Sequence, residues 1–164
     1  MRMSDRPSVE VHLEVAAPSE RVWELVSDVT RVGDWGGECV AAQWLDGADG
    51  PAIGVRFLGH QIRHGSKWET PATVIEAKPG VSFAWAVGDP TNPAATWRYQ
   101  LDADESGSTI VHYRAVMGPG PSGLTALIAD RPDREEYLIA LRLGEHKQNM
   151  MATLQAIKRA AEQQ

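Results

Sequence analysis

Hydrophobic and polar residues alternate in seven segments of the chain, a pattern typical of strands with one buried face and one solvent face. The first segment, VEVHLEV at 9–15, places its three valines and Leu13 on one side. Six more follow from residue 39 onward, separated by turn-forming runs such as DGADGP and KPG. Because the connections are short, we expect these six strands to run antiparallel. They are predicted at 39–45, 54–63, 67–77, 81–87, 96–103 and 109–115.

A helical pattern follows the first strand. Pro18 suits the first position of a helix, where its missing N–H carries no penalty. This helix is expected to run to about Asp28, and a second short helical segment is expected over 30–35. The pair Gly36-Gly37 is expected to end it.

The last part of the chain is predicted to be one long helix that begins after Pro132. Asp133 and Glu136 resemble a capping box at its start. The helix is amphipathic, and its apolar side is expected to cover the sheet. That side is formed by Leu143, Met150, Leu154, Ile157 and Ala161.

This order of elements resembles the START-like, helix-grip superfamily, which includes the birch-pollen allergen fold and the polyketide cyclase/dehydrase-like proteins. The resemblance implies an α+β fold in which a curved seven-stranded antiparallel sheet wraps around a long C-terminal helix, with two short helices after the first strand. It implies a single domain over 1–164, with an ordered core over about 7–162. The segments that carry it are APSERVWELVSDVTRVGDW (17–35), WETPATVIEAKPGVSFAW (68–85), ATWRYQLDADESGSTIVHYR (95–114) and MMATLQAIKRAAE (150–162).

Large rings with polar tips occupy the inward face of the predicted sheet, where a solid core usually has Val, Leu or Ile. They either fill the core or line a cavity, and five such rings on the strands are hard to pack solidly. The helix-grip resemblance implies a cavity between the sheet and the C-terminal helix. The run GPGPSG (118–123) would then hinge that helix or form the lip of the cavity. The predicted ligand-binding residues are Trp35, Phe57, Trp68, Phe83, Trp85, Trp97, Tyr99, Tyr113 and Met150.

The polar residues of the strands give no clear catalytic group. His112 and Arg114 are expected on the outer face, although a slip of one residue would turn them inward. His60 faces inward or outward depending on a register that the pattern leaves open. His60 and His64 lack a third ligand, so no metal site is expected. Cys39 has no cysteine partner and is expected to be a buried structural thiol.

Composition excludes several classes of function. The net charge of −6 argues against nucleic-acid binding, which needs a basic face. The polar start of the chain does not resemble a signal peptide, and no apolar run is long enough to insert stably in a membrane. We therefore expect a cytoplasmic protein. We expect no cofactor, and a homodimer is compatible with the sequence.

Three functions remain open, and the first is favoured. In the first, the protein binds an apolar small molecule, of lipid, polyketide or aromatic type, in the cavity. Alternatively, it is a polyketide cyclase/dehydrase-like enzyme that acts mainly by positioning its substrate. A third reading is a protein-interaction module with a filled core. Binding is favoured because the pattern places no charged or titrating side chain inside the cavity. This chain also departs from the helix-grip family in a way that favours binding. Many members have an acidic residue where Tyr113 stands here, so the cavity of this chain is expected to be more apolar and to lack that acid–base group.

Overall fold

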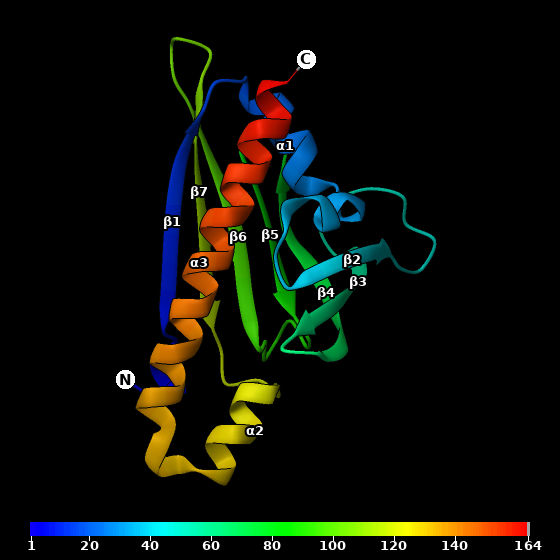
Figure 1. Ribbon diagram of the computed structural model, residues 1–164. Coiled ribbons are helices and arrows are strands. Elements are labelled where there is room, and N and C mark those ends of the chain that lie inside the picture. The colour runs from blue at the N-terminus through cyan, green and yellow to red at the C-terminus, as the bar shows by residue number, and fades with distance from the viewer. Residues whose placement is uncertain (164) are drawn as a thin grey trace.

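The computed structural model describes residues 1–163, and they form a curved sheet with a long helix lying across its inner face (Figure 1). All seven strands pair antiparallel in the order β1-β7-β6-β5-β4-β3-β2. The predicted α+β helix-grip fold is confirmed. The expected single domain includes residue 164, which lies outside the described residues. The strands are β1 (Ser8–Val15), β2 (Cys39–Trp44), β3 (Arg56–Arg63), β4 (Ser66–Lys78), β5 (Ser82–Val87), β6 (Ala95–Ala103) and β7 (Thr109–Met117).

The two short helices after β1 lie where the pattern predicted them. Helix α1 (Ser19–Ser27) follows Pro18, and the 3₁₀ helix η2 (Val29–Trp35) follows Asp28, whose carboxylate accepts a hydrogen bond from the Thr30 amide. Gly36 then adopts a left-handed conformation with φ of 80°, which glycine tolerates best, and the chain turns into β2. Together, α1 and η2 close one end of the space between the sheet and the long helix.

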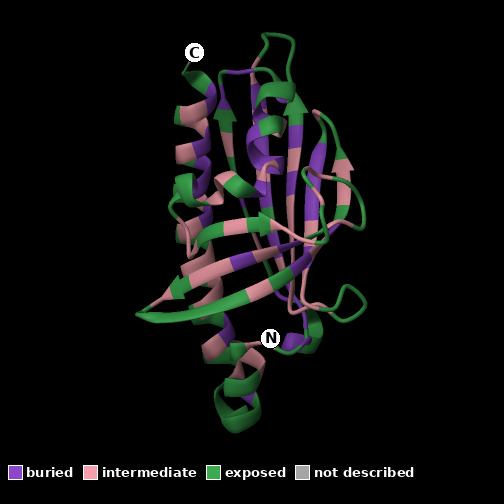
Figure 2. Cartoon of the chain, turned by 90° about the vertical axis from the view of Figure 1, so that its right-hand side faces the viewer, coloured by how far each residue is buried: buried purple, intermediate pink, exposed green. Residues whose placement is uncertain are grey.

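The long helix α3 (Glu135–Glu162) packs on the sheet through the C-terminal part of its apolar stripe. Its buried positions follow one side of the helix, which faces the strands (Figure 2). Met150, Leu154 and Ile157 are almost fully buried in the main core. None of the helices within residues 1–163 has both the length and the apolar content needed to cross a bilayer.

The start of α3 differs from the prediction. Asp133 lies in a preceding 3₁₀ turn, η3 (Pro132–Arg134), and Arg134 occupies the position before α3 without a side-chain cap. The Asp133 carboxylate instead accepts hydrogen bonds of 3.1 and 3.2 Å from Arg131. The predicted capping box is therefore wrong, because the helix begins later than the pattern indicated.

The outer face of the sheet carries the polar residues that alternation assigned to it. His112 on β7 contacts Asp102 on β6, with 2.9 Å between Nε2 and Oδ2, and Arg114 is exposed. His60 also faces outward, since its Nε2 lies 2.9 Å from the Gln43 amide oxygen. Phe57 on the same strand points inward and is buried. This register resolves the alternative that the sequence left open for β3.

The run 118–123 joins β7 to helix α2 (Gly123–Asp130) by close backbone contact with the loop before β6. A Cβ atom on Gly118 would lie 2.2 Å from the Pro93 carbonyl oxygen, and one on Gly120 would lie 2.2 Å from that of Asn92. Glycine is therefore required at both positions by space. Ser122, at the end of the run, lines the cavity described below, so the segment forms a lip of that cavity.

Replacing Gly120 with alanine should destabilise the fold by about 2 kcal/mol, because the new methyl group overlaps backbone atoms that cannot move independently. Gly144→Ala is the matched control, since Gly144 lies within α3 with nothing near its missing Cβ. That change should stabilise the protein by roughly 0.5–1 kcal/mol. Urea denaturation measures both. Equal effects of the two changes would contradict the close approach.

Candidate ligand-binding cavity

A cavity of about 820 Å³ lies between the inner face of the sheet, η2 and α3. Strands β2 to β7 supply most of its walls, and α3 with the start of α2 closes it on the other side. All nine residues predicted from the sequence lie around it, which settles their position but leaves their role in binding a prediction. They are Trp35, Phe57, Trp68, Phe83, Trp85, Trp97, Tyr99, Tyr113 and Met150.

The rings on the sheet are ordered by the pairing of the strands. Trp85 on β5 pairs with Trp97 on β6, and their rings stack with centroids 6.3 Å apart and planes inclined by 11°. Tyr99 pairs with Tyr113 on β7, and these rings stack at 4.1 Å, also inclined by 11°. The two pairs are neighbours, because alternate residues of one strand share a face. They form a continuous aromatic surface.

The same rings differ in depth. Phe83 is completely buried, and Tyr99 is only 4% exposed, so both contribute to the floor and to the core. Trp85 and Trp97 are half-buried and form the walls, whereas Trp68 is 37% exposed at the rim. The rings therefore divide between the two roles that the sequence left open: some fill the core, and others face open space.

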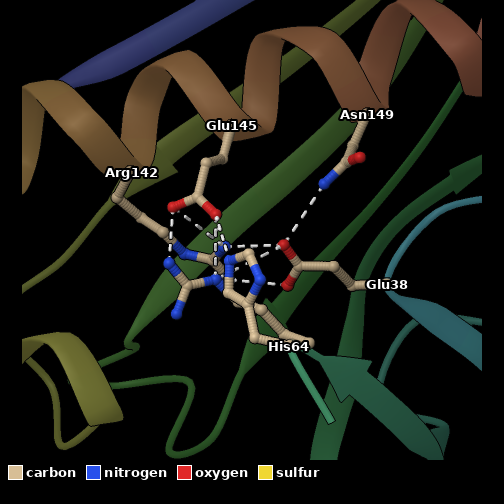
Figure 3. A network of polar contacts seen from close by, with 6 residues as sticks. Glu38, His64, Arg142, Glu145 and Asn149 are labelled. Carbon is tan, nitrogen blue, oxygen red and sulfur yellow. Dashed lines mark hydrogen bonds and ion pairs between the residues drawn. The ribbon is translucent and has the colours of Figure 1, made fainter. Parts of the chain in front are cut away.

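One wall of the cavity is polar, and the contacts among its side chains are drawn in Figure 3. Glu38, just before β2, receives two hydrogen bonds from Arg142 on α3, at 2.6 and 2.7 Å. Asn149, two turns further along α3, donates a third at 3.2 Å. A bidentate pair of this kind fixes both distance and orientation. It ties the N-terminal part of α3 to the edge of the sheet across the cavity.

A second ion pair extends this wall. Arg63 at the end of β3 donates hydrogen bonds of 2.6 and 3.0 Å to Glu145 on α3. His64 lies 3.4 Å from the same carboxylate and is mostly exposed. Arg63 also lies 4.0 Å from Glu38, and Arg142 lies 3.9 Å from Glu145, so the four charges form one network. The network contains two positive and two negative groups and has no net charge.

Burial and charge shift the ionisation of the groups on this wall. Partial burial alone would raise the pKa of Glu38, but its hydrogen bond to Arg142 and the charges of Arg142 and Arg63 outweigh this and lower it. A hydrogen bond to Arg63 lowers the pKa of Glu145, against a smaller effect of burial. Both carboxylates are therefore ionised at neutral pH.

His146 on α3 lies beside this network. Its ring meets the Trp97 ring edge to face, with centroids 5.0 Å apart and planes at 87°. Burial lowers the pKa of His146 to about 4, and the nearby charge of Arg142 acts in the same direction. The imidazole is therefore neutral at physiological pH.

Two tyrosines and Cys39, which also line the cavity, are neutral at physiological pH as well. Burial raises the pKa of Tyr113. Burial also raises the pKa of Tyr99, and the neighbouring Tyr113 adds to this effect. Burial likewise raises the pKa of the Cys39 thiol. Neutral hydroxyl and thiol groups can hydrogen bond, but they are poor acids and nucleophiles. Within residues 1–163, no three His, Cys, Asp or Glu side chains are arranged to hold a metal ion.

The polar wall corrects the expectation that the cavity contains no charged or titrating group. That expectation considered the inward faces of the strands, whereas most of the wall comes from α3. The helical spacing of Arg142, His146 and Asn149 continues the side of the helix that carries Met150. This helical spacing was a signal in the sequence from which the polar residues of α3 could have been placed in the cavity. Glu38 lies outside any periodic element and gave no signal.

Comparison with known families and structures shows the wider relationship. The model of the family described as "Polyketide cyclase / dehydrase and lipid transport" matches residues 6–136. A comparison with curated proteins gave no match.

Solved structures with this architecture include a polyketide-cyclase-like protein from Corynebacterium glutamicum. It is 31% identical over 94% of this chain and 91% of that one, with a TM-score of 0.68. A START superfamily protein from Mycobacterium smegmatis is 15% identical, over 95% of this chain and 97% of that one, with a TM-score of 0.68. The Zhui aromatase/cyclase from a Streptomyces species is 19% identical, over 95% and 93% respectively, with a TM-score of 0.67. The last two likenesses concern the fold alone.

The neutral state of His146 predicts a specific loss of stability in acid. The unfolded chain takes up the proton near pH 6.5 and the folded chain only near pH 4, so stability falls as pH drops between these values. From about pH 7.5 to about pH 5 this amounts to roughly 2 kcal/mol. Chemical denaturation of the wild type and of His146→Leu at both pH values measures it. The variant should lack this part of the loss, and parallel losses in the two proteins would refute the neutral buried imidazole.

The bidentate pair between Glu38 and Arg142 should contribute to stability through direct coupling, because both side chains are only 17% exposed. A double-mutant cycle with Glu38→Ala and Arg142→Ala should give a coupling energy of about 1–3 kcal/mol. The exposed pair Arg131 and Asp133 serves as the control and should couple by less than about 1 kcal/mol. Similar coupling energies for both pairs would contradict the claim that burial strengthens the pair between Glu38 and Arg142.

Proposed function

The chain belongs to the family of polyketide cyclases, dehydrases and lipid transport proteins, and on this premise we propose that it binds an apolar, ring-bearing small molecule in the cavity between the sheet and α3. The cavity itself is the observation that carries the proposal. Its volume of about 820 Å³ lies within the roughly 300–1,000 Å³ of small-molecule sites. Its walls offer flat aromatic faces at Trp85 and Trp97 and polar groups at one side, which can fix the orientation of a ligand.

The driving force for binding would be apolar burial, at about 25 cal/mol for each Å² removed from water before the cost of association. A planar ligand gains further from lying against the stacked rings, because offset stacking adds about 0.5–1.5 kcal/mol for each ring pair. The polar wall is already internally paired, so its charges need no partner from the ligand. This combination favours a molecule that is mostly apolar.

The protonation states of the His, Tyr and Cys side chains around the cavity favour binding over acid–base catalysis. An efficient general acid or base has a pKa near the working pH. The pKa of His146 is about 4, and the pKa values of the tyrosines and Cys39 are raised by burial. None of these groups is poised to exchange protons at neutral pH.

A cyclase-like enzyme that acts by positioning its substrate is the second candidate, and the polar wall is the observation that favours it. Arg63 and Arg142 border the aromatic surface, where guanidinium groups could hold a carbonyl oxygen during ring closure. Incubation with a poly-β-ketone thioester separates the two candidates. Enzymatic turnover changes the pattern of cyclised products, whereas a binding protein leaves the spontaneous pattern unchanged.

A substitution that fills the cavity with a large side chain should weaken the binding of a ligand there. Ala42 and Ala41 are adjacent on β2, but Ala42 lines the cavity and Ala41 is exposed on the other side. Ala42→Phe should weaken the binding of methylpyrene at least tenfold, and Ala41→Phe should leave it unchanged. Energy transfer from tryptophan to the probe reports binding, and thermal melting verifies that each variant is folded.

The role of the aromatic wall is tested by Trp85→Ala, which removes one of the two stacked indoles. Binding of methylpyrene should weaken about tenfold, because an aromatic contact surface is lost. Failure of the wild-type protein to bind methylpyrene, hydroxypyrene and long-chain fatty acids would count against the proposed function. The interaction module with a filled core would then gain weight.

A further inference from the structure

The imidazole of His146 is a polar group without a protein partner on the cavity wall. Its polar neighbours are engaged: Glu38 with Arg142 and Asn149, and Glu145 with Arg63. The His146 ring is half-buried and faces the cavity, and among residues 1–163 it takes part in no hydrogen bond or ion pair. It contacts Trp97 only through the edge-to-face arrangement of the two rings. Within the described residues its ring nitrogens are not among the fully buried atoms that lack a partner, so they stay accessible from the cavity, where a ligand can pair with them.

The charges around His146 restrict what that partner can be. Arg63 and Arg142 are each neutralised by a carboxylate, so neither is available to an anionic ligand without breaking an ion pair. A ligand carboxylate would lie near Glu38 and Glu145 in an apolar cavity, without a free cation to offset its desolvation. A neutral polar group avoids both penalties.

We propose that His146 is a specificity-determining residue, which hydrogen bonds a neutral hydroxyl or carbonyl group on a ring-bearing ligand that lies against Trp97, and that the polar wall selects such ligands over carboxylates. This inference rests on the proposed function and names the chemical class of ligand that the same cavity takes.

The chemistry of a neutral imidazole matches this class. One ring nitrogen donates a hydrogen bond and the other accepts one. A carbonyl oxygen can accept from the donor nitrogen, and a hydroxyl can pair with either nitrogen. The low pKa of His146 supports this state, because a neutral ring remains available to both partners across the physiological range. The position beside Trp97 places the polar contact next to the stacking surface, so one rigid ligand can use both.

Three probes of the same shape test the inference: methylpyrene, hydroxypyrene and pyrene carboxylate. Their affinities are measured at neutral pH by energy transfer from tryptophan. Pyrene carboxylate should bind the wild type at least tenfold more weakly than hydroxypyrene. In His146→Phe, the affinity for hydroxypyrene relative to methylpyrene should fall about fivefold, as expected for the loss of one hydrogen bond.

Two further variants distinguish recognition from a structural effect. His146→Gln keeps a donor and an acceptor and should restore part of the preference for hydroxypyrene. His60→Phe is the matched control, because His60 lies on the outer face of β3, and it should leave all three affinities unchanged. If His146→Phe does not fold, His146→Leu replaces it in the same comparison.

The outcomes show whether the inference alone fails or whether the proposed function fails with it. If both neutral probes bind and His146→Phe weakens them equally, the inference is overturned while the proposed function stands. The same holds if pyrene carboxylate binds as tightly as hydroxypyrene. If none of the probes binds the folded wild type, the proposed function fails, and the inference fails with it.

Discussion

Apolar contact between the C-terminal half of α3 and the sheet holds the two layers of the protein together, and it is interrupted partway along the helix. Leu154 and Ile157 are buried against the sheet in the main core. Toward the start of the helix, the same side carries Arg142, Glu145 and His146. Burying these charges fully against the aromatic surface would carry a desolvation cost, even though they are paired. Over this stretch the helix is held by ion pairs to the far edge of the sheet, and the space beneath it is open. Nearer its start, Ile139 packs in a second apolar cluster with Met117 of β7.

The sequence predicted the elements well because each has a strong local pattern. Strands such as 9–15 and 96–103 alternate cleanly, and the turns between them contain glycine or proline at the expected places. The same alternation correctly assigned Tyr99 and Tyr113 to the inner face and His112 to the outer face. The start of α3 was the exception. There, the two candidate signals, Pro132 and Asp133, belong to a 3₁₀ turn rather than to the helix cap.

The polar wall was less predictable, and its residues show why. Arg63 shares a face with Phe57, but this followed only once the register of β3 was known. Arg142 and His146 have helical spacing, yet polar residues on a terminal helix ordinarily face water. Glu38 lies between a 3₁₀ helix and a strand, where no periodicity exists. Contacts that join segments 104 residues apart, such as Arg142 with Glu38, arise from the tertiary fold alone.

The central claim is that the space between α3 and the sheet receives a ligand, and a crystal structure of the protein grown with hydroxypyrene tests it most directly. The account predicts density for the probe flanked by Trp85 and Trp97, with its hydroxyl within hydrogen-bonding distance of His146 and the pair between Glu38 and Arg142 intact. A structure without the probe, in which α3 has moved onto the sheet and Met150 packs against the two indoles, would contradict it.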